Sequence, residues 1–141
     1  MKKIKLVLPI LIVFSVILSS CEGDLKNRFT VRNMSQSQLT INFRGNHYDV
    51  PSGSFVNGEW MPAVYNIKEI PKGIYQYTTV YGIPAGANTS SAEGDLAGEI
   101  EFREGTTALI IYSSALTDSA YTIFATLTTD TDLSEENPTS P

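Results

Sequence analysis

The sequence contains little of the chemistry on which most catalytic and metal sites depend. Its 141 residues include one cysteine, Cys21, and one histidine, His47. A single cysteine excludes a disulfide within the chain, and His47 with nearby Asp49 offers fewer ligands than a zinc site requires. No serine lies in the Gly-x-Ser-x-Gly motif that presents the nucleophile of many hydrolases. We therefore expect a protein that is not an enzyme, that has no metal ion or cofactor, and that is stabilised by packing and backbone hydrogen bonds.

Basic residues are also scarce, with 10 Lys and Arg against 15 Asp and Glu. Lys2, Lys3 and Lys5 precede Cys21, whereas all fifteen acids follow it. Residues 21–141 therefore have a formal charge of 7 − 15 = −8. Nucleic acids and anionic lipid headgroups both favour clustered Lys and Arg. The average charge argues against either of them as a partner.

The longest hydrophobic run is too short to cross a membrane. Residues 6–18 form an apolar stretch of 13 residues that includes Pro9, whereas a transmembrane helix needs about 20 apolar residues. A basic start, a short apolar run and small residues at a cleavage site are typical of a secretory signal peptide. We predict such a peptide over residues 1–20, and a permanent membrane anchor is the alternative.

The residues at the end of this run carry a more specific signal. Leu18-Ser19-Ser20-Cys21 resembles the lipobox of bacterial lipoproteins, in which an apolar residue and two small residues precede a cysteine. In that family the thiol receives a diacylglyceryl group, cleavage makes the cysteine the new N-terminus, and its amine is often acylated, as with palmitate. The resemblance implies lipidation of Cys21, and two or more acyl chains give stable membrane attachment. It also implies a cell-envelope location outside the cytoplasm, at the outer membrane if the host has one. A chance cysteine after an ordinary signal peptide is the alternative.

Beyond these residues the dominant hydrophobic period is two. Leu39, Ile41 and Phe43 alternate with polar residues, as do Ile100 and Phe102. Such alternation indicates strands with one face in a core and one in water, which is typical of antiparallel sheets. Turn residues at 8–12-residue spacing predict an all-β fold, an antiparallel β-sandwich of roughly 7–8 strands, with a small β-barrel as the alternative.

The composition divides the mature chain into three parts. Residues 21–26 form a short polar tether, and residues 27–128 form the predicted sandwich. Residues 129–141 contain four acids, two prolines and one large apolar residue. Because such a segment buries too little to offset its ordering entropy, we predict a disordered acidic tail.

Glycine-containing pairs predict the turns. Asn57-Gly58 predicts a two-residue hairpin turn that joins Ser54–Val56 to Glu59–Met61, and Gly45-Asn46 predicts another between residues 39–44 and 47–50. Residues 84–98 have no hydrophobic period and predict a long loop, which is either functional or simply mobile.

A second resemblance lies in the middle of the chain. The segment Pro71-Lys72-Gly73-Ile74-Tyr75-Gln76-Tyr77 resembles the Pro-x-Gly-x-Tyr turn of bacterial immunoglobulin-like and transthyretin-like modules. The resemblance covers seven residues and implies a strand whose tyrosine packs between two sheets. The cysteine pair of true immunoglobulin domains is absent.

Two groups of residues remain as candidate sites. Glu99 and Glu101 share a strand face, but carboxylate pairs that hydrolyse glycosides flank a cleft, so we expect a solvent-facing strand. The chain's seven tyrosines and Trp60 suggest an aromatic recognition surface, although we favour core positions for four of them: Tyr75, Tyr77, Tyr112 and Tyr121. If the Asn57-Gly58 turn is exposed, Phe55, Trp60 and Met61 beside it are the predicted partner contact.

These observations predict a lipid-anchored envelope protein that acts as a binding or structural module for a protein or glycan partner. Two alternatives remain open. A carboxylate-dependent, glycan-acting enzyme requires two acids that converge in a cleft, one of them desolvated. A carrier of a small apolar ligand requires a continuous internal cavity of several hundred Å³.

Overall fold

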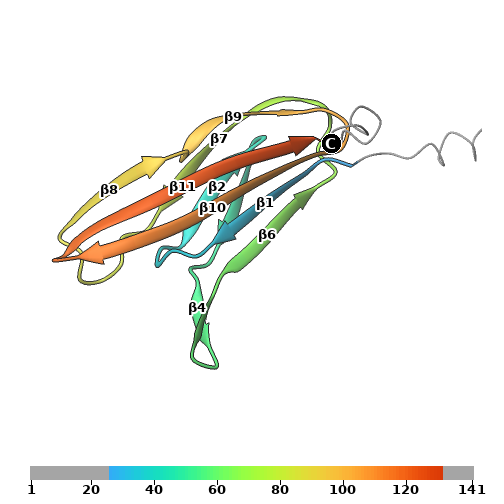
Figure 1. Cartoon of the computed structure of the whole chain (residues 1–141). Helices are drawn as coiled ribbons and strands as arrows, with labels where there is room; N and C mark the ends of the chain where they lie inside the picture. Colours follow the sequence, from blue (N-terminus) through green and yellow to red (C-terminus); the bar gives the residue numbers. More distant parts are fainter. Residues whose placement is uncertain (1–25, 132–141) are drawn as a thin grey trace, which may run out of the picture.

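The structure, a computed structural model, describes residues 26–131 (Figure 1). The predicted signal peptide, Cys21 and residues 132–141 of the predicted tail lie outside the described residues. The described part of the chain contains no helix with the length and hydropathy of a membrane span.

Two packed sheets confirm the predicted all-β sandwich. The larger has the strand order β6 (Ala63–Lys68), β1 (Arg28–Asn33), β10 (Thr106–Thr117), β11 (Ala120–Thr131) and β8 (Thr89–Gly94). The smaller has the order β3 (Asn46–Val50), β2 (Leu39–Phe43), β7 (Gly73–Tyr81) and β9 (Ala97–Phe102). A separate hairpin pairs β4 (Ser54–Val56) with β5 (Glu59–Met61). Within residues 26–131 these eleven strands exceed the 7–8 predicted, and each sheet keeps two open edges instead of closing into a barrel.

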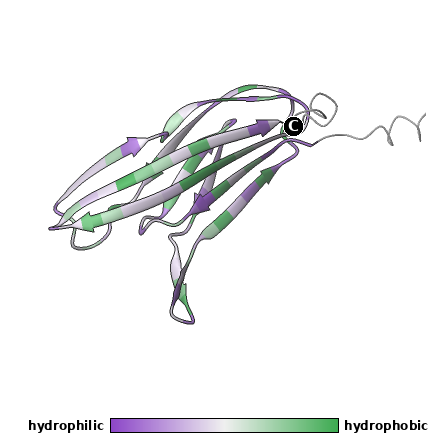
Figure 2. Cartoon of the chain, viewed as in Figure 1, coloured by the Kyte–Doolittle hydropathy of each residue, from purple (hydrophilic) through white to green (hydrophobic). Residues whose placement is uncertain are grey.

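The period-two residues form the core between the two sheets. Phe29, Phe43 and Phe102 are at most 1% exposed, and hydrophobic and hydrophilic residues alternate along the strands (Figure 2). The ring of Phe43 packs edge-to-face against Phe29 at a centroid distance of 5.1 Å and against Phe102 at 6.0 Å. Each such pair adds about 0.5–1.5 kcal/mol to the hydrophobic contribution of the buried rings. Because the chain's single cysteine cannot form an internal disulfide, packing of these side chains stabilises the sandwich.

Pairing in the larger sheet differs from the antiparallel prediction in two places. Strand β1 runs parallel to β10, and β8 runs parallel to β11, while the remaining neighbours in both sheets are antiparallel. Parallel neighbours cannot be joined by a tight turn and come from distant parts of the chain. Alternation reports which face of a strand is buried, and it contains no information on which strand lies beside it.

One predicted turn is confirmed and the other is displaced. Asn57 and Gly58 have φ values of 52° and 84°, as a two-residue turn between β4 and β5 requires. The β2–β3 turn instead uses Arg44 and Gly45, with φ values of 54° and 78°, because Phe43 pairs directly with Asn46. The turn therefore begins one residue before the predicted Gly45-Asn46 pair.

The prediction of a long loop over residues 84–98 is wrong. The segment contains the whole of β8 and the start of β9. Every residue of β8 is exposed, so this edge strand lacks the apolar alternation that would reveal it in the sequence. At its end, Gly94 has a φ of 93°, and a Cβ there would lie 2.2 Å from the carbonyl oxygen of Ala125, so the close approach to β11 requires glycine.

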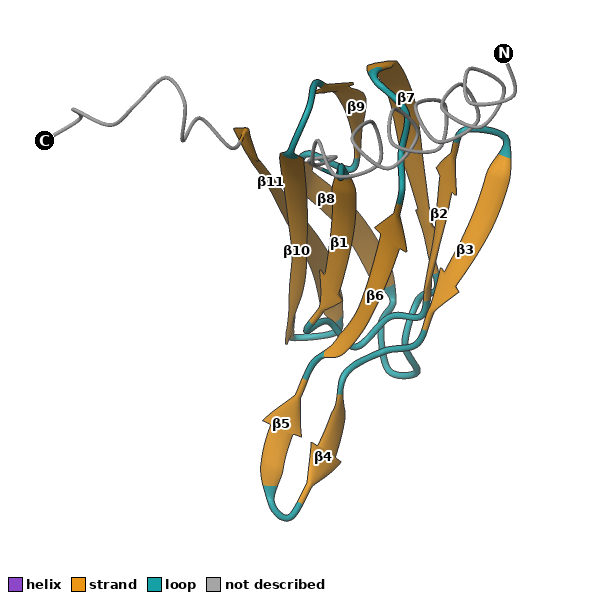
Figure 3. Ribbon diagram, turned by 90° about the vertical axis from the view of Figure 1, so that its right-hand side faces the viewer, coloured by secondary structure: helices purple, strands orange, loops and turns teal. Residues whose placement is uncertain are grey.

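The two ends of the described chain lie together at one end of the sandwich. Asn27, which is 4% exposed, donates from Nδ2 to the Ile70 carbonyl at 2.8 Å and accepts from the Thr106 amide at 2.7 Å. Thr106 in turn pairs with Thr131, so β11 continues beyond the predicted domain end at residue 128. The β4–β5 hairpin leaves the sandwich at the opposite end (Figure 3).

Candidate functional site

The β4–β5 hairpin stands apart from both sheets. Its two strands pair only with each other among the described strands, and the hairpin projects beyond the end of the sandwich (Figures 1 and 3). Phe55 lies opposite Trp60, while Val56 lies opposite Glu59 on the other face. The predicted contact residues are therefore brought together on one projecting element.

Large apolar side chains are exposed on this hairpin. Phe55 is 71% exposed, Val56 49% and Met61 44%. We call these three residues the hairpin surface. Phe55 lies on one face of the hairpin, and Val56 and Met61 lie on the other. Exposed apolar residues concentrated on one short element are typical of a site of interaction. Two more, Val64 and Tyr65, follow at the start of β6, where they are 50% and 40% exposed.

Trp60 has a different environment from the other predicted contact residues. Its indole Nε1 donates to the Met34 carbonyl at 2.8 Å, and its ring packs edge-to-face against Phe55 at 4.9 Å. The ring also covers Gly53, where a Cβ would lie 2.7–2.9 Å from three indole atoms. A two-stranded hairpin alone is marginally stable in water. Trp60 therefore fixes the hairpin to the sandwich and leaves Phe55 and Met61 on its surface.

A buried polar network holds the base of the hairpin. Asn33, which is fully buried, donates from Nδ2 to the carbonyls of Pro51 and Ser37, each at 2.8 Å. Its Oδ1 accepts from the amide and the hydroxyl of Ser35 at 2.9 and 2.6 Å. The Ser35 carbonyl then accepts from the Gly53 amide at 3.1 Å. No buried side-chain polar atom in residues 26–131 lacks a partner, and a fully satisfied network of this kind is rigid.

The sequence did not point to several of these supporting residues. Met34 and Asn33 are about twenty positions before the hairpin, and no local pattern links them to it. Gly53 belongs to the turn-like stretch Pro51-Ser52-Gly53, but a glycine in such a stretch usually indicates a turn. Here its lack of a side chain makes room for the indole of Trp60.

The pair His47 and Asp49 does not form part of a metal site in the described residues, and the pair Glu99 and Glu101 does not form a pair of catalytic acids in a cleft. His47 contacts the Asn42 side chain, and Asp49 accepts from the Thr40 hydroxyl at 2.7 Å. Residues 26–131 contain no group of three or more potential metal ligands. Glu99 and Glu101 lie on the exposed face of β9, as predicted. All acidic side chains in this range are exposed: Asp49, Glu59, Glu69, Glu93, Asp95, Glu99, Glu101, Glu104, Asp118 and Asp130.

The four singled-out tyrosines belong to the core, as we favoured. Tyr77, Tyr112 and Tyr121 are at most 2% exposed, and partly buried Tyr75 packs against the rings of Phe43 and Phe102. The Tyr77 hydroxyl donates to the Asp95 carbonyl at 2.6 Å. Burial, with a smaller effect of the Asp95 charge, raises the pKa of Tyr77 to about 12. Burial also raises the pKa of Tyr112, and its hydrogen bond with Thr79 opposes that effect.

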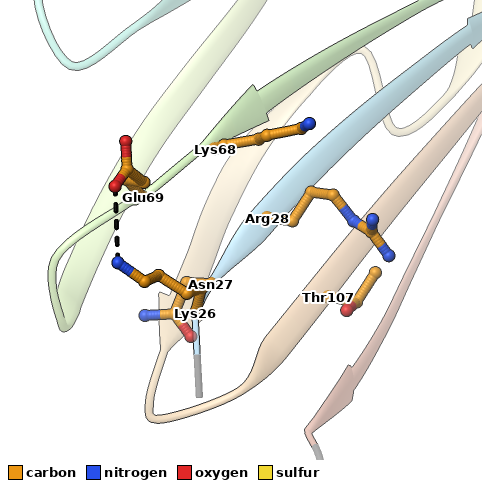
Figure 4. Close-up of a pocket in the computed structure, with 6 residues that line it drawn as sticks. All are labelled: Lys26, Asn27, Arg28, Lys68, Glu69 and Thr107. Atoms are coloured by element: carbon orange, nitrogen blue, oxygen red, sulfur yellow. Dashed lines mark hydrogen bonds and ion pairs between the residues drawn. The ribbon is translucent and has the colours of Figure 1, made fainter. Parts of the chain in front are cut away.

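Two hollows on the surface are lined mostly by polar residues. One, of about 380 Å³, lies at the end opposite the hairpin and is lined by Lys26, Asn27, Arg28, Lys68, Glu69 and Thr107 (Figure 4). The other, of about 340 Å³, lies around the β2–β3 turn, with Asn42, His47 and Gln76 among its lining residues. Both are open to solvent, unlike the enclosed apolar cavity that a carrier of apolar ligands requires.

No known protein family matches this sequence, and no curated protein matches it.

Proposed function

We propose that the protein is anchored in the cell envelope by lipids on Cys21 and binds a partner protein through the hairpin surface. The observation that supports the proposal is the position of the hairpin relative to the start of the described chain. The described chain begins at one end of the sandwich, five positions after Cys21, and the exposed apolar hairpin lies at the other end. A lipid anchor would therefore leave the hairpin surface as the part that points away from the membrane.

Chain geometry gives the scale of this arrangement. Five residues span at most about 18 Å when fully extended, so an anchored Cys21 keeps Lys26 close to the bilayer. Strand β6 spans the sandwich between Ala63, at the hairpin end, and Lys68, at the end near Lys26. Its length is about 17 Å at 3.3 Å per residue. The three-residue strands of the hairpin extend this reach by about 10 Å more.

A protein partner fits the hairpin surface better than a glycan. Phe55, Val56 and Met61 offer apolar contact area, and the indole N–H of Trp60 is already donated to the Met34 carbonyl. Aromatic and Met side chains are enriched at protein interfaces. Sugar recognition also requires polar groups that bond to hydroxyls, and Glu59 is the one charged side chain on these two strands.

The anchor is tested on the intact chain. Cys21→Ala or globomycin treatment should leave an unprocessed precursor without acyl chains, and mass spectrometry of the wild-type protein should find them on Cys21. A wild-type mature chain with a free thiol and no acyl mass would contradict the anchor.

The partner site is tested by photocrosslinking in intact cells. A photoreactive amino acid at Phe55 should give one dominant crosslinked protein, and the same amino acid at Ile74 should not. Ile74 is the matched control because it is 63% exposed on the outer face of β7, away from the hairpin. The identified partner, once purified, should bind the Met61→Ser variant at least about tenfold more weakly than wild type, since about 1.4 kcal/mol of apolar contact is lost. Equal crosslinking from both positions would contradict the proposal.

The two alternative functions receive no support from the described residues. The enzyme requires converging acids with one desolvated, and every acid in residues 26–131 is exposed. The carrier requires an enclosed apolar cavity, and the hollows described above are open to solvent.

A further inference from the structure

Three cations line one hollow at the end of the sandwich opposite the hairpin. Lys26, Arg28 and Lys68 line the larger hollow together with Asn27, Glu69 and Thr107 (Figure 4). Residues 21–141 are acidic on average, with a formal charge of −8. The fold therefore gathers basic residues at one place in a chain that has few of them.

Two of these cations lie in an arrangement that reduces the stability of the sheet. Arg28 and Lys68 are direct partners in the antiparallel β1–β6 register, and like charges directly opposite each other are destabilising. The ion pairs within residues 26–131 involve other cations, Lys26, Lys72 and Arg103, so neither member of this pair is neutralised there. An anion bound between Arg28 and Lys68 would convert the repulsion into attraction.

The hollow also contains an uncharged hydrogen-bond donor, Thr107, and a buried residue, Asn27, that fixes the backbone beneath it. Thr107 is the β10 partner of Arg28 on its other side, and Figure 4 shows the Thr107 side chain beside the Arg28 guanidinium. Buried Asn27 holds the start of β1 through its bonds to Ile70 and Thr106. The backbone positions of the donors are therefore set before any ligand arrives.

The acids near the hollow do not cancel its charge. Glu69 pairs with Lys26 at 3.4 Å, and exposed Asp130 is the β11 partner of Thr107. Three cations and two acids give a local charge of 3 − 2 = +1. The average charge, which argued against anionic partners, therefore does not describe this end of the sandwich.

We propose that Arg28, Lys68 and Thr107 form a binding site for a phosphate group. Arg28 presents a planar fork of donors that matches phosphate oxygens, Lys68 adds a second charge, and Thr107 adds a hydroxyl. The phosphate has two sources, the headgroup of an anionic phospholipid or a soluble phosphate ester. The site does not depend on the proposed lipid anchor, whereas the headgroup as its source does, since an anchored Cys21 keeps this end within about 18 Å of the bilayer.

The site is tested by NMR titration of residues 21–141 carrying Cys21→Ser, which retains the whole described sandwich. The probes are inorganic phosphate, glycerol 3-phosphate, phosphatidylglycerol bicelles and phosphatidylcholine bicelles. Saturable shifts of the Arg28, Lys68 and Thr107 amides are expected with at least one phosphate monoester or with the phosphatidylglycerol bicelles. The Arg28→Gln/Lys68→Gln double variant should bind at least about tenfold more weakly, since two charged donors are removed.

Arg32→Gln is the matched control, because Arg32 is an exposed cation on the same face of β1 and lies outside the hollow. Its binding should equal that of wild type. Shifts with soluble phosphates assign the site to a free ester, and shifts with phosphatidylglycerol alone assign it to a headgroup. Absence of saturable shifts with every probe would overturn the site, as would binding that the double variant retains. The unlipidated chain keeps this result separate from the test of the anchor.

Discussion

The sandwich and its hairpin use the same kinds of residue in opposite ways. Phe43 in the sandwich is 1% exposed and contacts three other rings, whereas Phe55 in the hairpin is 71% exposed and contacts one, Trp60. The difference arises because a strand in either sheet faces a second sheet, and a strand in the hairpin faces water. Apolar residues in the first setting stabilise the fold, and in the second they contribute little to it. This contrast leads us to assign stability to one region and recognition to the other.

The largest effect is expected from the core. Phe43→Ala removes a ring that packs against Phe29, Tyr75 and Phe102. Deleting a buried aromatic ring leaves a cavity and costs about 3–5 kcal/mol of unfolding free energy. Urea denaturation measures this loss. A loss below about 1 kcal/mol would contradict the claim that the buried rings of the sandwich stabilise the fold.

Alkaline pH should also weaken the sandwich through its buried tyrosines. The pKa of Tyr77 is about 12 when folded against 10 for the free side chain, so the folded state keeps a proton that the unfolded state loses. This contribution is complete below pH 10 and is lost as the pH rises through 12, at about 1.4 kcal/mol per pH unit. Tyr112 changes stability in the same direction.

Denaturation at pH 9 and at pH 11 tests this dependence. Tyr77→Phe is the matched variant, since it keeps the ring and removes the ionisable hydroxyl. Its unfolding free energy should fall less steeply with pH than that of wild type. Identical slopes in the two proteins would mean that Tyr77 ionises equally well when folded.

A smaller effect is expected where the hairpin joins the sandwich. Gly53→Ala places a methyl group 2.7–2.9 Å from the Trp60 ring, which must move. Overpacking of this kind costs about 1–3 kcal/mol, and the tryptophan emission should shift as the ring becomes exposed. Gly82→Ala is the control, because its added methyl comes no closer than 3.9 Å to another atom. Unchanged emission in the Gly53 variant would remove the role given to Trp60.

The smallest effect on stability is expected at the hairpin surface. Phe55→Ser changes an exposed side chain, and the unfolding free energy should stay within about 0.5 kcal/mol of wild type. Partner binding should nevertheless fall at least about tenfold, since apolar contact area is lost. A variant that is strongly destabilised would contradict the assignment of stability to the sandwich alone. A variant that binds its partner as well as wild type would contradict the assignment of recognition to the hairpin surface.

The sequence predicted much of the fold because alternation and turn chemistry are local. The buried positions of Leu39, Ile41 and Phe43 and the Asn57-Gly58 hairpin are all confirmed. Strand β8 was missed because its exposed residues, which start at Thr89, leave no apolar period. The projecting hairpin residues were predicted as a contact, but their support from Met34 and Gly53 was not, since it depends on residues far apart in the chain.

The sequence by itself determined that the chain forms two-faced strands, because the burial of every second side chain follows from the geometry of a single strand. It also determined where the β4–β5 hairpin turns, because Asn57 and Gly58 tolerate positive φ at low cost. Only the tertiary structure decided that β1 lies between β6 and β10, and therefore that Arg28 meets Lys68 and Thr107. Neighbours in a sheet are selected by contacts summed over the whole core, and no local pattern records that sum.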